Sequence, residues 1–495
     1  MGKNILIFSD GTGQAGGYMP DEARSNVYKL FRATRVGPDT DIDPKRQIAF
    51  YDGGLGSRAH GEGIRIKAWR RLYNQLGRAT GLGITQNIID CYAEIIRVWQ
   101  PGDRIYLFGF SRGAYTARCV GGVLKYCGVP TAINAGKGPP RPLQRDPKSA
   151  RRIASEAVKH VYQHGGSING DPYRAEREQR ALQFRAKYLS GDARVSNTAP
   201  YFIGVWDTVQ TLGAGTLGLT VLACVYVGFS ASMSVLLEMV TGLPFWPAFM
   251  GLGYLVPTAV YLAMCLRYRG IVSLARYRLG FYDTRLHYAV RYARHALAID
   301  ENRERFDCVA WDDEDPRQTL ADKARDVPRF KQVWFAGSHS DVGGSYPETE
   351  SRLSDIALDW MVQEATNLPD PIRIDPSVLK LYPDSRGAQH DERKAFVSAC
   401  PAWMTRCALW LVDHREFGWR EGHRKVPRDA ELHATVHERF RYHGVLVHGD
   451  IVPYRPRALR HHPEVSGYWP KTNTQPRSGL RRRNVRDATE SRPAT

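Results

Sequence analysis

The serine of the sequence GFSRG, Ser111, is the first candidate for chemistry in this chain. A short apolar run, 105–108, precedes it, and residues that can form a helix follow it. A strand, a sharp turn and a helix in this order form a nucleophile elbow, which exposes the serine hydroxyl at the edge of a sheet. The pattern predicts that Ser111 is the nucleophile of a hydrolase, and a plain glycine-rich turn is the alternative.

A serine nucleophile needs a histidine base and an acid that orients it. His339 and Asp207 each follow an apolar run with the character of a buried strand, at 332–336 and 201–206. Serine, acid and histidine in this chain order match the α/β-hydrolase order, and parallel strands would bring all three to one sheet edge. Asp341, two residues after His339, is the alternative acid and could instead cap its own loop.

The oxyanion of such a reaction needs backbone N–H donors. The residue after the nucleophile, Arg112, is one candidate donor. Gly11 or Thr12, in the loop after the first predicted strand, is the candidate for the second. Asp10 could hold that loop through hydrogen bonds to backbone N–H groups, and an ordinary Asp-Gly turn is the alternative interpretation.

Carboxylates at the predicted strand ends allow a second chemistry. Asp10, Asp52, Asp207 and Asp341 could hold a divalent metal together with His339, and phosphoester hydrolysis would follow. No HxH or DxD spacing occurs among these positions, and the turn at the GFSRG serine would have no function. We therefore expect no metal site and no cofactor.

The segments around these residues alternate between strand and helix patterns. Apolar runs at 4–8, 47–51 and 105–108 are typical of strands, whereas 25–34 and 84–99 have helical spacing. This alternation predicts a doubly wound, mostly parallel sheet, in which ligands bind beyond the carboxyl ends of the strands.

A long apolar stretch interrupts this pattern. Glu238 is the single formal charge between Asp207 and Arg267, and each half, 212–237 and 239–266, is long enough to span a bilayer. Arginines follow the second half, so the positive-inside rule places both ends and the catalytic domain in the cytoplasm, at a bacterial inner membrane. We expect an inserted transmembrane helical hairpin, and a hairpin buried in a large core is the alternative.

Composition limits the partners. The 495 residues carry a formal net charge of +18, which favours anionic lipid, and no nucleic-acid-binding motif appears. Eight cysteines are scattered without a CxxC pair, which argues against a zinc site and against a disulfide framework. We therefore expect membrane lipid as a partner and no nucleic acid.

Four segments are expected from these patterns. The first and second parts of the core occupy 1–210 and 268–465, with the hairpin at 211–267 and a disordered basic tail at 466–495. Within the second part, a basic amphipathic stretch at 277–299 is expected to form a helix on lipid or on the sheet.

Five stretches resemble one known family. They are GFSRGAYTAR, FSDGTGQ, YDGGLG, GVWDTV and WFAGSHSDVGG. They are similar to DUF2235, an α/β-hydrolase-like domain that includes type VI secretion lipase effectors of the Tle1 kind, and the resemblance runs in order from residue 4 to about residue 460. It implies a glycerophospholipid substrate.

Together these observations predict a membrane-anchored serine hydrolase that cleaves carboxylic esters of phospholipids through an acyl-enzyme on Ser111. Metal-dependent phosphoester hydrolysis and a non-catalytic membrane-bound binding protein are the alternatives.

Overall fold

A computed structural model describes most of the chain. The described residues are 2–11, 23–53, 84–164, 173–209, 216–255, 286–304, 306–311, 326–399 and 421–469. Thr12 and residues 470–495 of the expected tail lie outside them.

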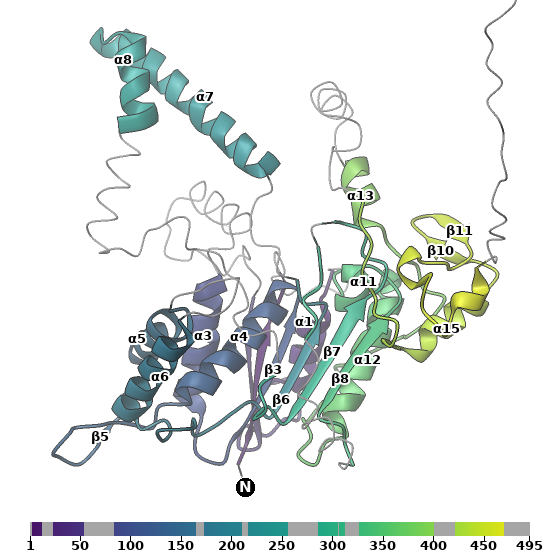
Figure 1. Ribbon diagram of the computed structural model, residues 1–495, viewed down its shortest axis with the longest axis horizontal. Coiled ribbons are helices and arrows are strands. Elements are labelled where there is room, and N and C mark those ends of the chain that lie inside the picture. The colour runs from purple at the N-terminus through teal and green to yellow at the C-terminus, as the bar shows by residue number, and fades with distance from the viewer. Residues whose placement is uncertain are drawn as a thin grey trace, which may run out of the picture.

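The centre of the fold is a seven-stranded parallel sheet with the strand order β2-β1-β3-β6-β7-β8-β9 (Figure 1). Its strands are β1 (Asn4–Ser9), β2 (Gln47–Asp52), β3 (Arg104–Phe110), β6 (Phe202–Trp206), β7 (Tyr292–Ala298), β8 (Phe330–Phe335) and β9 (Glu431–Leu432). The order reverses at β1, because the chain passes outward to β2 and then returns to β3 on the other side. Ligand sites of open α/β sheets lie at such switch points.

Helices cover both faces of the sheet, as the doubly wound prediction requires. Alternate residues of β1 point into different cores, because side chains of a strand alternate between its faces. Ile5 and Ile7 join one core cluster, whereas Leu6 and Phe8 join the other. The first cluster contains α3 (Ile84–Val98), α4 (Arg112–Cys127), α5 (Pro147–Glu156) and α6 (Arg174–Tyr188), and the second contains α1 (Asn26–Thr34) and α12 (Arg352–Thr366).

Short elements complete the described chain. A third apolar cluster joins the ends of β7 and β8 to the C-terminal part, around Phe440. The remaining helices and strands beyond β8 are α11 (His339–Gly343), η3 (Glu348–Glu350), α13 (Glu392–Ala399), α15 (Ala434–Arg441), β10 (Val445–Val447), β11 (Asp450–Val452), η4 (Arg457–Leu459) and η5 (Ser466–Tyr468). A π-helix, η1 (Ala157–Tyr162), continues α5, and β4 (Ala132–Ile133) pairs with β5 (Arg141–Pro142).

The prediction of a helix at 277–299 is wrong for the residues that the structure describes. Tyr292–Ala298 forms β7, which pairs in parallel with β6 and β8 and is buried along its whole length. Alanine, leucine and arginine favour a helix, but two neighbouring strands supply backbone partners that this segment takes instead. Residues 277–285 lie outside the described part.

The transmembrane hairpin expected at 211–267 is not supported. The apolar stretch forms α7 (Thr216–Thr241), α8 (Phe245–Met250) and a π-helix, η2 (Gly251–Leu255). Among the residues that the structure describes, none of the helices is long and apolar enough to cross a bilayer. Residues 256–267 of the second expected span are not described. The predicted placement of the catalytic domain in the cytoplasm depends on that hairpin and stays a prediction.

Candidate active site

Ser111 lies at the turn between β3 and α4, with a backbone φ of 58°. Positive φ is unusual for a residue other than glycine and is typical of the strained turn of a nucleophile elbow. The N–H of Ser111 donates to Trp206 O at 3.1 Å, which ties the turn to the end of β6. An added Cβ at Gly113 would lie 2.0 Å from Ser9 O, so only glycine lets the start of α4 approach the end of β1 this closely.

His339 and Asp207 meet at the same sheet edge. His339 Nδ1 lies 2.6 Å from Asp207 Oδ2, and the two side chains are 6% and 0% exposed. His339 begins α11, whereas Asp207 directly follows β6 with a φ of 35°. The His339 ring packs at a tilt against Phe110, the residue before Ser111, with the ring centroids 4.6 Å apart. The imidazole is therefore next to the serine turn.

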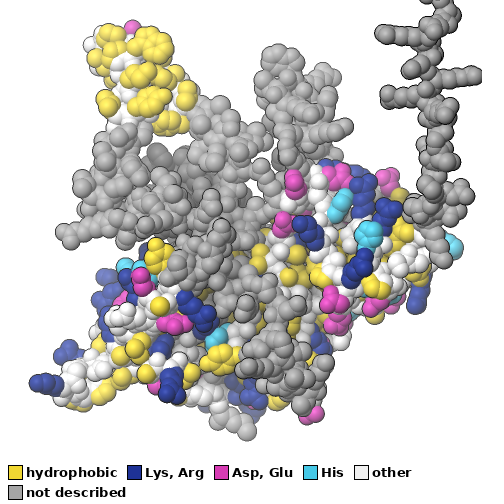
Figure 2. Space-filling model, viewed as in Figure 1, with side chains coloured by type: hydrophobic (Ala, Val, Ile, Leu, Met, Phe, Trp, Pro, Cys, Tyr) yellow, Lys and Arg dark blue, Asp and Glu magenta, His cyan; other side chains and the backbone are white. Residues whose placement is uncertain are grey.

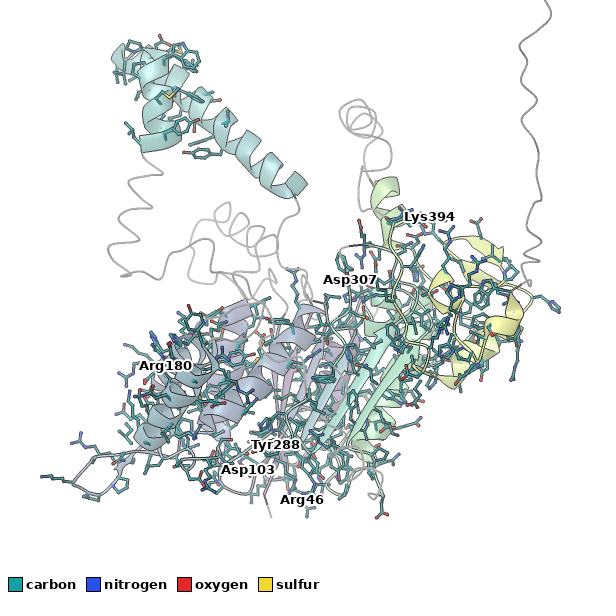
Figure 3. The ribbon with its side chains drawn as sticks, viewed as in Figure 1. Arg46, Asp103, Arg180, Tyr288, Asp307 and Lys394 are labelled. Carbon is teal, nitrogen blue, oxygen red and sulfur yellow. The ribbon has the colours of Figure 1, made fainter. Side chains whose placement is uncertain are left out.

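The position of this edge can be followed in Figure 3. Asp307, whose neighbour Phe306 contacts the His339 ring at 5.8 Å between centroids, lies beyond the carboxyl ends of the strands. Asp103 and Tyr288, which precede β3 and β7, lie at the opposite end of the sheet.

Asp207 is ionised by its neighbours in spite of its burial. Burial alone would raise the pKa of this carboxyl, but the charge of Arg424 and the hydrogen bond with His339 outweigh burial, so its pKa is lowered. Arg424 Nη2 donates to Asp207 Oδ2 at 2.7 Å, and Asp207 Oδ1 accepts from Ala298 N at 3.1 Å. No local pattern in the sequence marks Arg424, which lies 217 residues from its partner, so its role could not be predicted.

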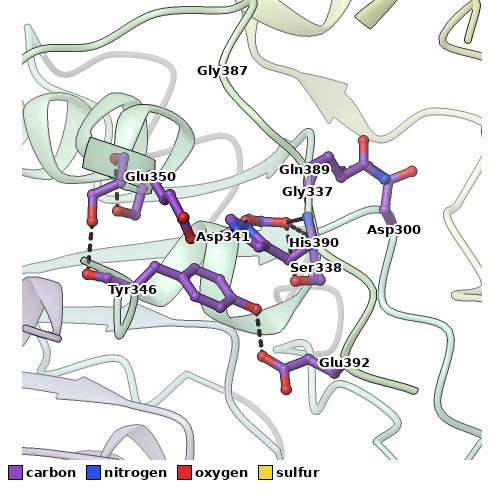
Figure 4. A network of polar contacts seen from close by, with 12 residues as sticks. Asp300, Gly337, Ser338, Asp341, Tyr346, Glu350, Gly387, Gln389, His390 and Glu392 are labelled. Atoms are coloured by element: carbon purple, nitrogen blue, oxygen red, sulfur yellow. Dashed lines mark hydrogen bonds and ion pairs between the residues drawn. The ribbon is translucent and has the colours of Figure 1, made fainter. Parts of the chain in front are cut away.

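Asp341, the alternative acid, contacts a different histidine (Figure 4). Its Oδ1 lies 2.7 Å from His390 Nδ1, and its Oδ2 accepts from the N–H of Ser338 at 2.9 Å and from the N–H of His390 at 3.0 Å. The His390 ring also stacks on Tyr346, with centroids 3.7 Å apart, and its Nε2 lies 3.2 Å from Glu350. Burial would lower the pKa of His390, but the bonds to Asp341 and then Glu350 outweigh it and raise the pKa.

A buried ion pair supports the loop that carries His339. Glu301 Oε2 accepts from the backbone N–H of His339 at 3.3 Å, and Glu301 forms a bidentate pair with Arg303 at 2.7 and 2.8 Å. Burial would raise the pKa of Glu301, but its hydrogen bond and charge interaction with Arg303 lower it. Glu301 and Arg303 stand in a segment without a recognisable motif, so this pair could not be predicted from the sequence either.

The loop after β1 lies beside Ser111. An added Cβ at Gly11 would lie 3.5 Å from Ser111 Cβ. Asp10 Oδ2 accepts from the hydroxyls of Ser25 and Tyr51 at 2.5 and 2.6 Å, and Asp10 Oδ1 accepts from the N–H of Gly11 at 2.7 Å. Asp10 therefore holds this loop, and the Gly11 N–H already has a partner in this structure.

The two arginines next to the elbow have different surroundings. Arg112 is the first residue of α4, so its backbone N–H lies at the N-terminal end of that helix. Arg118 is buried, lies 4.5 Å from the centre of the Trp311 ring and donates to Val309 O. The side chain of Arg118 thus packs inside the fold.

The carboxylates at the sheet edge have separate partners. Asp10 bonds hydroxyls, Asp52 accepts from Ser9 Oγ at 3.1 Å, and Asp341 pairs with His390. Within the described ranges, no three His, Cys, Asp or Glu side chains are grouped so that they could hold a metal ion.

A parallel α/β sheet with a serine elbow and a buried His–Asp pair at one edge is an arrangement typical of serine hydrolases. The model of the T6SS phospholipase effector Tle1-like catalytic domain family matches residues 3–364. This chain belongs to that family.

Other proteins are similar over part of their length. A 131-residue segment is 32% identical to the uncharacterized protein YEL023C of Saccharomyces cerevisiae, over 26% of this chain and 18% of the yeast protein. An uncharacterized protein from Pseudomonas aeruginosa matches with a TM-score of 0.34 and 15% identity, over 77% of this chain and 48% of its own. The Tle1 effector bound to the VgrG spike of the type 6 secretion system matches with a TM-score of 0.30 and 15% identity, over 71% and 53%. The chain spans about half of each solved chain and about a fifth of the yeast protein.

Proposed function

We propose that this protein is an α/β-hydrolase-like serine esterase that cleaves carboxylic esters of phospholipids. The observation that carries this proposal is the buried pair of His339 Nδ1 and Asp207 Oδ2, 2.6 Å apart, beside the strained turn of Ser111. Membership in the Tle1-like family supports the lipid substrate.

In this mechanism, His339 Nε2 accepts the proton of the Ser111 hydroxyl while Oγ forms a bond to the ester carbonyl carbon. Asp207 holds Nδ1 protonated and stabilises the imidazolium. The tetrahedral intermediate expels the alcohol, which receives the proton from His339 and leaves an acyl-enzyme. Water, activated by the same imidazole, then adds to the acyl carbon and releases the fatty acid and free Ser111.

The oxyanion needs donors at the start of α4. The backbone N–H of Arg112 lies at a helix N-terminus, where the helix dipole favours negative charge. We propose it as one donor. The second donor is proposed in the loop that contains Gly11 and Thr12, where the Gly11 N–H would have to leave Asp10 to bind an oxyanion.

The membrane is proposed as both substrate source and attachment site. The α7–α8 apolar surface consists of residues that are 61 to 80% exposed: Phe229, Met239 and Val240 of α7, Trp246 of α8, and Tyr254 and Leu255 of the adjoining η2. Figure 2 shows hydrophobic side chains gathered over α7 and α8. Apolar patches of this kind often mark membrane contact.

Fluorophosphonate labelling and hydrolysis of phospholipid vesicles test the mechanism. We expect Ser111→Ala to abolish labelling, and Ser111→Ala and His339→Ala each to lower kcat at least about 10⁴-fold. Asp207→Asn should lower kcat about 10⁴-fold, because the wrong imidazole tautomer would prevail.

Asp341→Asn is the matched control, since it alters a buried carboxylate bonded to a histidine in the same loop region. We expect a much smaller loss of kcat than in Asp207→Asn. Labelling of Ser111→Ala equal to that of the wild type would contradict the proposal, and a larger loss in Asp341→Asn would move the role of the acid to Asp341.

A further inference from the structure

The carboxylate of Asp207 has a second partner besides His339. Its Oδ2 lies 2.6 Å from His339 Nδ1 and accepts from Arg424 Nη2 at 2.7 Å. The Asp207 and Arg424 side chains are 0% and 2% exposed. An ion pair shielded from water in this way is electrostatically strong, and removal of one partner leaves an uncompensated buried charge.

The backbone that carries Arg424 is fixed against the segment after β7. The N–H of Gly422 donates to Asn302 O at 2.8 Å, and Arg303 forms a β-bridge with Glu421. An added Cβ at Gly422 would lie 2.6 Å from the backbone of Glu304, so a glycine is required for this approach. Arg424 therefore reaches the site from a firmly docked segment.

The contacts of Arg424 differ from those of another buried arginine in the C-terminal part. Arg439 donates to the carbonyl oxygens of Ser385 and Gly387 and to Gln389 Oε1, which ties one loop together. Arg424 donates to Asp207 Oδ2 through Nη2, and the thiol of Cys308 is another of its side-chain neighbours. The carboxylate to which Arg424 is paired is thus the acid of the site.

We propose that Arg424 is a positioning residue, which fixes the orientation and charge of the Asp207 carboxylate and through it the imidazole of His339. This inference rests on the proposed serine mechanism. The family match ends at residue 364, so the active site would depend on a residue from beyond the matched domain.

Arg424→Ala and Arg424→Lys test the role. We expect Arg424→Ala to lower kcat and the rate of fluorophosphonate labelling about 100-fold with little change in KM, because a misplaced base slows the chemical step and leaves binding intact. Free guanidinium ion should restore part of the activity of Arg424→Ala and none of that of His339→Ala. Arg424→Lys, which keeps the charge without the planar fork, should lie between wild type and Arg424→Ala.

Arg294→Lys is the matched control. Arg294 is equally buried and pairs with Glu364, but it stands on β7 away from the His–Asp pair. We expect it to keep the wild-type kcat even if the protein melts at a lower temperature. Circular dichroism identifies variants that do not fold. If Arg424→Ala does not fold, Arg424→Lys is compared with the wild type in its place.

The outcomes separate the two proposals. If fluorophosphonate labels the wild type and a folded Arg424 variant at the same rate, the positioning role is wrong and the serine mechanism is unaffected. A folded wild type with no Ser111-dependent labelling would overturn the serine mechanism, and with it this inference.

Discussion

At the scale of single residues, three buried carboxylates at one sheet edge differ in the partners that surround them. Asp207 stays ionised because Arg424 and His339 compensate its burial. Asp341 accepts hydrogen bonds from its own loop and from His390. Asp10 has hydroxyl and N–H donors but no positive partner among the described residues, so burial raises its pKa to about 6.

The raised pKa of Asp10 makes stability depend on pH. A carboxyl whose folded pKa lies above the unfolded value of 3.8 costs stability when it ionises. We expect the wild type to lose about 3 kcal/mol of unfolding free energy relative to Asp10→Asn as the pH rises from about 3 to about 7. Chemical denaturation of both proteins across this pH range measures the two unfolding free energies. If they change with pH in the same way, the raised pKa of Asp10 is contradicted.

At the scale of elements, the close packing of α4 on the end of β1 aims Ser111. The helix can start there because Gly113 has no side chain facing Ser9 O. A helix displaced by even about 1 Å would misplace the serine hydroxyl relative to His339.

Gly113→Ala tests this packing. The added Cβ would meet backbone rather than a flexible side chain, so we expect a loss of about 2 to 4 kcal/mol in stability and strongly reduced labelling of Ser111. Gly138→Ala is the control, because its Cβ would meet no atom closer than 3.9 Å. If Gly113→Ala melts and is labelled like the wild type, α4 packs less closely on the end of β1 than the structure indicates.

At the scale of the whole molecule, apolar and basic features coexist. Figure 1 shows α7 and α8 standing apart from the sheet, and they carry the α7–α8 apolar surface. The formal net charge of the chain is +18. Anionic vesicles offer both an apolar interior and a negative surface, so both features favour the same partner.

Co-sedimentation with phosphatidylglycerol vesicles tests membrane attachment. The double change Met239→Asp and Val240→Asp alters side chains that are 80% and 75% exposed, and we expect at least a 10-fold loss of binding. Ile451→Asp, at a side chain 79% exposed on β11, should bind like the wild type. Binding should also weaken as salt increases. Equal binding by the double variant would exclude this surface as the contact.

The sequence by itself determined the parallel sheet and the three residues at its edge. Local periodicity and turn chemistry mark strands and the serine elbow over short distances, so β1, β3, β6 and the position of Ser111 follow from them. Asp207 and His339 could be proposed because each follows a strand. Their contact at 2.6 Å depends on the fold, which brings the two loops together.

Only the tertiary structure decided β7, the partner of Asp341 and the place of Arg424. The sequence of β7 favours a helix, and neighbouring strands override that preference. His390 and Arg424 lie 49 and 217 residues from the carboxylates that they bind. Pairing of buried charges depends on distance in space and on exclusion of water, and neither leaves a local pattern in a sequence.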